Sequence, residues 1–157
     1  EAVQRALKTS GLAPGRLELE ITESVFINDN RGTVERLHAL RRLGVQIALD
    51  DFGTGYSSLA YLRAFQFDRI KIDRSFVQGI ESDIDAQSIL RAIVALGRTL
   101  RMKVVAEGVE TEVQRLLVQA AGCELVQGYL FWAALPAAEA RALLETRDGE
   151  PALRQAS

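Results

Sequence analysis

Short runs rich in valine, isoleucine and leucine alternate along this chain with longer segments of helical periodicity. Such runs predict β-strands, and they cover Leu17–Thr22, Val45–Asp50, Arg69–Asp73, Lys103–Glu107 and Leu125–Gly128. Apolar residues at helical spacing predict helices between them, at Thr33–Leu43, Ile84–Leu100, Glu110–Ala121 and Pro136–Leu144. Strands joined by helices of this length run parallel and have right-handed connections, so the pattern predicts an α/β domain.

Two of the predicted helices have apolar residues that recur at helical spacing and form a stripe. In the segment 84–100 the stripe is Ile89, Ile93, Leu96 and Leu100. In the segment 110–121 it is Val113, Leu116, Leu117 and Ala120.

The two faces of the predicted strands differ in polarity. Because alternate residues point to opposite sides, one side carries apolar residues such as Ile47, Leu49 and Ile70, and the other carries Glu20, Lys71 and similar residues. Parallel sheets normally have both faces covered. A polar face with charged residues at the strand ends is instead typical of a TIM-like (β/α) barrel interior.

A closed barrel of this type needs eight strands and roughly 250 residues, whereas five strands are predicted in these 157 residues. The chain therefore looks like an incomplete barrel that lacks its first part. We expect residues 1–146 to be the C-terminal portion of this barrel and residues 147–157, which lose apolar periodicity, to be a frayed or disordered tail.

Composition narrows the classes of function. A net charge of −2 does not favour a polynucleotide ligand, although a bound metal could supply positive charge for a small anionic substrate. Cys123 is the single cysteine, which excludes an internal disulfide and fits a small buried hydrophobe. With no apolar stretch long enough to span a bilayer, we expect a cytoplasmic protein or the cytoplasmic part of a membrane-anchored sensor.

Four carboxylates lie at or just beyond predicted strand ends, and Lys71 lies on a strand between them: Glu20, Asp50, Asp51 and Glu107. Four acidic groups in one cavity repel one another unless they are protonated, paired with a cation or bound to metal. Without histidine or thiolate, these hard oxygen ligands suit Mg²⁺, Mn²⁺ or Ca²⁺. The alternative is a set of ordinary salt bridges at the barrel mouth.

The segment that follows the aspartates, FGTGYSSL at 52–59, contains Gly53 and Gly55, which allow a tight loop. It is either a simple turn or a lid beside the metals, which Glu23 could hold from the neighbouring strand end. His38, the single histidine, falls in a helical segment, so we do not expect it to be a catalytic base.

Five segments in order resemble the signatures of the EAL domain, a family of bacterial cyclic-di-GMP phosphodiesterases. They are LELEITES (17–24), LDDFGTGYSSL (49–59), IKIDRSF (70–76), VVAEGVET (104–111) and VQGYLF (126–131). The resemblance covers residues from about 5 to 145, and several long motifs in the family's order are far more specific than any one of them.

The resemblance implies a reaction and roles for individual residues. The family opens one phosphodiester of cyclic di-GMP to give linear pGpG with Mg²⁺ or Mn²⁺, with two ions expected. Metal ligands would be Glu20, Asp50, Asp51 and Glu107. Lys71 and Glu107 would act in catalysis, where Lys71 could orient water, deprotonate it or neutralise phosphorane charge. Glu23 would steady the loop, and Gln127 would lie near the substrate.

The resemblance also implies partners and shows two departures. Family members commonly act as homodimers behind regulatory domains. The Glu-Ala-Leu segment that names the family, and an asparagine from the next strand, are absent from these residues, so the ligand set here is incomplete. Residues 132–134 are Trp-Ala-Ala where the family has a small residue, a basic residue and proline. An inactive receptor for cyclic di-GMP, or a protein-interaction module, is the alternative function.

Overall fold

A five-stranded parallel sheet forms the centre of the computed structural model, which describes residues 1–25, 30–53, 62 and 64–145. The strands follow one another in space in their order along the chain. They are β1 (Glu18–Thr22), β2 (Gln46–Phe52), β3 (Arg69–Ile72), β4 (Lys103–Ala106) and β5 (Leu125–Val126). All four neighbouring pairs are parallel, which confirms the predicted sheet.

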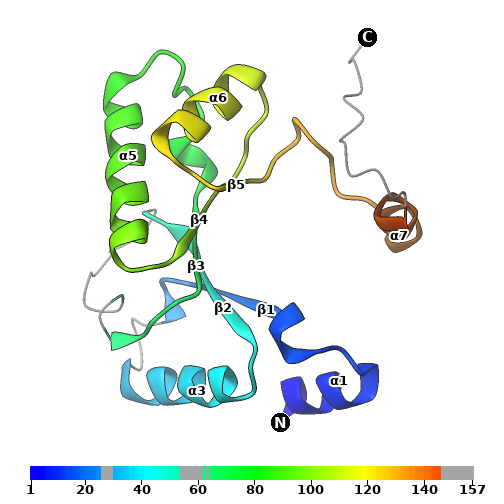
Figure 1. Cartoon of the computed structure of the whole chain (residues 1–157). Helices are drawn as coiled ribbons and strands as arrows, with labels where there is room; N and C mark the ends of the chain where they lie inside the picture. Colours follow the sequence, from blue (N-terminus) through cyan, green and yellow to red (C-terminus); the bar gives the residue numbers. More distant parts are fainter. Residues whose placement is uncertain (26–29, 54–61, 63, 146–157) are drawn as a thin grey trace.

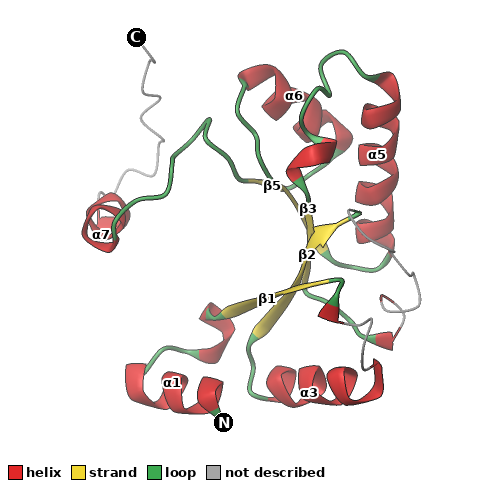
Figure 2. Ribbon diagram, turned by 180° about the vertical axis from the view of Figure 1, so that it is seen from behind, coloured by secondary structure: helices red, strands yellow, loops and turns green. Residues whose placement is uncertain are grey.

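The sheet curves, and helices α3, α5 and α6 lie along its outer side (Figures 1 and 2). Helix α7 stands apart from them on the open side (Figure 1). The α-helices are α1 (Ala2–Ser10), α3 (Asn30–Arg42), α5 (Ile84–Thr99), α6 (Glu112–Ala121) and α7 (Ala137–Glu145). Two short 3₁₀ helices are η1 (Pro14–Arg16) and η2 (Arg74–Phe76). Consecutive parallel strands with helices outside form part of a (β/α) barrel, as predicted.

The apolar side of each strand packs against the outer helices. A single core cluster joins Ile47, Leu49, Ile70, Ile72, Val104 and Ala106 of the sheet with Leu37, Leu90, Val94 and Val118 of the helices. Ala48, Lys71 and Val105 are also buried, but their alternate positions place them on the inner face. The predicted division of the strands into two faces is therefore confirmed.

The residues that helices α5 and α6 bury match the predicted stripes only in part. Helix α5 buries Leu90, Ile93, Val94 and Gly97, whereas Ile89 is exposed. Two interleaved sets of residues have helical spacing in this segment, and the set containing Gly97 faces the sheet because a glycine allows close approach. Helix α6 buries Gln114 and Val118, whereas Val113 and Leu116 are exposed.

Several segment boundaries also differ from the predictions. Helix α1 was not predicted, and α6 begins at Glu112 rather than at Glu110. Strand β2 continues two residues beyond Asp50, to Phe52, for a reason given below. The predicted tail, 147–157, lies outside the described residues. Across the described part of the chain, no helix combines the length and apolar character needed to cross a membrane.

Gly97 provides a test of this packing. A Cβ atom at this position would lie 2.6 Å from Cγ2 of Val104 and 3.3 Å from Cγ2 of Ile70. We therefore expect Gly97→Ala to lower the free energy of unfolding by about 1–3 kcal/mol, although alanine is the better helix former. Urea unfolding followed by circular dichroism measures this change. Ser88→Ala on the exposed side of α5 is the control and should have little effect, and a stabilised Gly97→Ala variant would contradict the packing.

Candidate functional site

Lys71 lies where the carboxyl ends of four strands meet. From β3 its ammonium Nζ contacts Oε2 of Glu20 at 2.9 Å, Oδ1 of Asp50 at 3.0 Å and Oε1 of Glu107 at 2.7 Å. These carboxylates belong to β1, β2 and the residue after β4. The Lys71 side chain is 7% exposed, while that of Glu20 is 47% exposed. The site is thus a buried cation on β3 surrounded by acidic groups from β1, from β2 and from the end of β4.

A β-bulge near the carboxyl end of β2 brings Asp50 and Asp51 into the same cluster. Leu49 pairs with Ile70 and Phe52 pairs with Ile72, so Asp50 and Asp51 together lie opposite Lys71 alone. Asp51 has φ 53°, a left-handed conformation that aspartate tolerates better than most residues. In a regular strand the adjacent aspartates would point to opposite faces. The bulge removes this alternation and returns Phe52 to the buried core.

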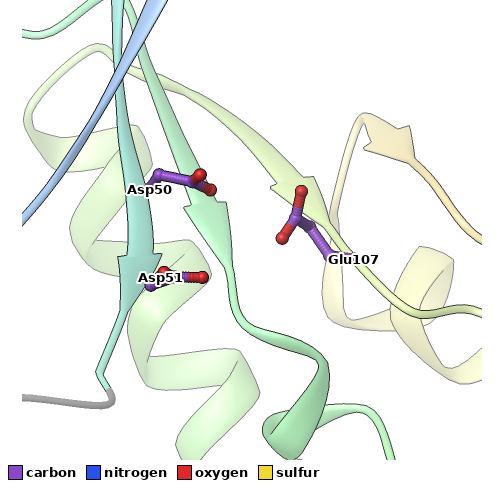
Figure 3. A group of neighbouring side chains, drawn as sticks. All are labelled: Asp50, Asp51 and Glu107. Atoms are coloured by element: carbon purple, nitrogen blue, oxygen red, sulfur yellow. The ribbon is translucent and has the colours of Figure 1, made fainter.

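Three of the carboxylates lie close enough to hold one metal ion. One oxygen from each of Asp50, Asp51 and Glu107 lies within 4.8 Å of the other two, and Figure 3 shows the two aspartates on β2 and Glu107 just after β4, with β3 between them. Oδ1 of Asp50 is buried and accepts no hydrogen bond of good geometry in the described structure, although it forms the ion pair with Lys71. Glu20 lies beyond this group and contacts Lys71 instead.

Burial and the neighbouring charges shift several pKa values in the cluster. Burial raises the pKa of Glu107, and the contact with Lys71 partly opposes this shift. Burial and the neighbouring Asp50 raise the pKa of Asp51. For Lys71, burial acts to lower the pKa, but the close contacts with the carboxylates of Glu107, Glu20 and Asp50 together outweigh it and raise the pKa above its usual value. Lys71 is therefore a cation at neutral pH in this state.

The loop after Glu107 is held by a capping box. Oε1 of Gln114 accepts hydrogen bonds from the backbone N–H groups of Glu110 and Thr111 at 2.8 and 3.1 Å. The Thr111 hydroxyl in turn accepts from the Gln114 backbone N–H at 3.1 Å. Thr-x-x-Gln at 111–114 is the known sequence signature of a capping box, which we did not predict from the sequence. The capping box fixes the start of α6 five residues beyond the Glu107 carboxylate.

Glu23 contacts the beginning of the loop that follows the aspartates. Its Oε1 accepts a hydrogen bond from the backbone N–H of Gly53 at 3.2 Å. Gly53 has φ 98°, and a Cβ atom there would lie 2.6 Å from the Phe76 ring. The rest of the FGTGYSSL segment lies outside the described residues.

Other predicted residues lie around the cluster or away from it. Gln127 follows β5, and its backbone N–H donates to the carbonyl of Ala106, the neighbour of Glu107, at 2.9 Å; its side chain is exposed. His38 is exposed on α3, with its ring 5.1 Å from that of Phe65. Cys123 is buried in the core, and burial raises the pKa of its thiol to about 11.

Comparison with known proteins identifies a family that this chain matches in sequence. Residues 1–134 match the family model of the EAL domain. The chain is 46% identical over 156 residues to the cyclic di-GMP phosphodiesterase NbdA of Pseudomonas aeruginosa, and the match covers 98% of this chain and 20% of that protein. The chain thus spans about a fifth of this relative's length.

Solved structures are also similar to this chain in fold and sequence. The PaMucR phosphodiesterase in complex with c-di-GMP has a TM-score of 0.83 and 45% identity, over 88% of this chain and 56% of that one. The manganese and cy-diGMP complex of Klebsiella pneumoniae BlrP1 at pH 9.0 has a TM-score of 0.78 and 38% identity, over 83% of this chain and 33% of that one.

The hydrogen bond between Glu23 and Gly53 generates a prediction. We expect Glu23→Ala to lower the free energy of unfolding by about 1–3 kcal/mol, because it leaves a backbone N–H group without its acceptor. Glu23→Gln keeps an acceptor oxygen at the same distance along the side chain and should cost less. Urea unfolding of the two variants measures the difference. Equal losses would contradict a role for the acceptor oxygen at this position.

Proposed function

Because this chain belongs to the EAL domain family, we propose that residues 1–146 form the C-terminal part of a barrel that hydrolyses cyclic di-GMP to linear pGpG. The observation that carries the proposal is the meeting of Asp50, Asp51 and Glu107 oxygens within 4.8 Å at the strand ends. The strand ends are where barrel enzymes place their reacting groups. The PaMucR structure, which contains c-di-GMP, supports the choice of substrate.

The donor set fits a divalent metal. Asp50, Asp51 and Glu107 offer carboxylate oxygens without nitrogen or sulfur ligands, which suits Mg²⁺ or Mn²⁺, and the buried Oδ1 of Asp50 has no hydrogen-bond partner of good geometry in the described structure. We assign these three residues and Glu20 as ligands, with two ions in the complete barrel. The metal supplies Lewis acidity that activates water and stabilises negative charge on the phosphate. The manganese in the BlrP1 complex supports the assignment.

The chain's own residues have separate roles in this proposal. Lys71 acts in catalysis, because its ammonium adjoins three of the carboxylates and can orient the attacking water and neutralise charge that develops on the phosphate. Glu107 acts as a metal ligand, and without metal its carboxylate contacts Lys71. Gln127 contacts the substrate from the strand end beside Glu107, and Glu23 steadies the loop through Gly53.

The proposal extends to the rest of the protein. The relatives are much longer than this chain: it covers 20% of NbdA and 20% of the bifunctional diguanylate cyclase/cyclic di-GMP phosphodiesterase MucR. We therefore propose that preceding segments supply the missing strands, the remaining metal ligands and regulatory domains. We further propose that the domain acts in the cytoplasm as a homodimer.

The removal of one proposed ligand tests the function. We expect Asp50→Asn to lower the rate of pGpG formation at least ~100-fold, since loss of groups that only support metal ligands already costs 10–100-fold. The full natural chain that contains residues 1–157 is incubated with cyclic di-GMP and Mg²⁺ or Mn²⁺, and products are separated by chromatography with mass detection.

Glu124→Gln is the matched control for this assay. Glu124 is an exposed carboxylate just before β5, at the opposite end of the strands, so turnover should be unchanged. Full turnover by Asp50→Asn would contradict the metal assignment. Binding of cyclic di-GMP without any product from the parent protein would identify a receptor instead of an enzyme.

A further inference from the structure

Lys71 occupies the position in the cluster where a positive charge is needed. Its ammonium contacts oxygens of Glu20, Asp50 and Glu107 at 2.7–3.0 Å. An ammonium has three N–H donors, and three carboxylates lie within ion-pair distance of it. The side chain is 7% exposed, so little water can replace the contacts. The metal-free cluster is thus held together by a cation of the chain itself.

Two of the carboxylates in contact with Lys71 also belong to the metal-capable group. The three carboxylates that could hold a metal ion are those of Asp50, Asp51 and Glu107. Asp50 and Glu107 also contact the ammonium of Lys71, whereas Glu20 contacts the ammonium from outside the group of three. A dication near the shared oxygens would lie within a few ångströms of the ammonium. Like charges at such distances repel strongly where water is scarce. Both cations therefore compete for the Asp50 and Glu107 oxygens.

We propose that Lys71 serves as a resident cation that holds the metal-free site together, and that divalent metal binds only as the ammonium gives up its contacts with Asp50 and Glu107. The inference rests on the metal centre proposed above and adds a property of the apoprotein. Lys71 lowers the metal affinity of the site and at the same time prevents the carboxylates from spreading apart before metal arrives.

Replacement of Lys71 by a neutral side chain of similar length tests the proposal. We expect Lys71→Met to bind Mn²⁺ with a Kd at least about tenfold lower than that of the parent, because a competing charge is gone. The metal-free variant should melt at a lower temperature than the parent, since the carboxylates then repel one another without a counter-charge. Mn²⁺ should raise its melting temperature by more than it raises that of the parent.

These measurements do not require turnover. Electron paramagnetic resonance measures the concentration of free Mn²⁺ during titration of the full natural chain. The melting temperature is measured with and without Mn²⁺. Lys103→Met removes an exposed lysine from the neighbouring strand and should leave the Kd unchanged. Lys71→Arg keeps the charge and should show no gain in affinity. If Lys71→Met does not fold without metal, Lys71→Gln takes its place in the same titration.

The outcomes separate this inference from the proposed function. If the parent and all variants fail to bind Mn²⁺, the metal centre itself is wrong. If the parent binds Mn²⁺ and the neutral variants at position 71 bind it equally or more weakly, the metal centre stands and the competition by Lys71 is overturned. An equal gain in Lys103→Met would also overturn it, because the effect would then come from net charge alone.

Discussion

The mutual repulsion of acidic groups at the strand ends is the constraint on which the site depends. Glu20, Asp50 and Glu107 come from three strands that the parallel sheet brings to one edge. Uncompensated, these charges would oppose the folding of the sheet that presents them. The buried ammonium of Lys71 contacts all three, which allows a cluster suited to metal to exist in the folded apoprotein.

The remaining structure positions this cluster through backbone geometry. The bulge at Asp50 and Asp51 allows both aspartates to join the cluster at the carboxyl ends of the strands, while Leu49 and Phe52 stay in the core. Gly97 allows α5 to approach the sheet beneath Val104 and Ile70. The capping box of Thr111 and Gln114 fixes the chain that follows Glu107. Packing on the outer side of the sheet and chemistry on its inner side are therefore separate, and strand alternation links them.

The sequence predicted the architecture well because alternation in the strands is a local property. Runs such as 45–50 and 103–107 show their two faces directly, and the helices between them require parallel strands. The helix stripes were harder to predict because two sets of residues in 84–100 share helical spacing, and only packing against Val104 and Ile70 selects the set with Gly97.

The sequence predicted which residues form the candidate site but not how they are arranged. The acidic residues and Lys71 were identified from the polar ends of the strands, whereas the bulge depends on the pairing of β2 with β3 and has no signal in the local pattern. From the sequence, Lys71 was expected only to lie on a strand between the acidic residues. In the structure its single charge is shared among three carboxylates, because the strands place their oxygens around one ammonium.

The most direct test of this account is to locate the metal. Crystals of the full natural chain are soaked in Mn²⁺, and anomalous diffraction at the manganese edge gives the positions of the bound ions. The account predicts a strong peak bounded by the carboxylates of Asp50, Asp51 and Glu107. The absence of a peak between these residues, with manganese bound elsewhere on the chain, would contradict it.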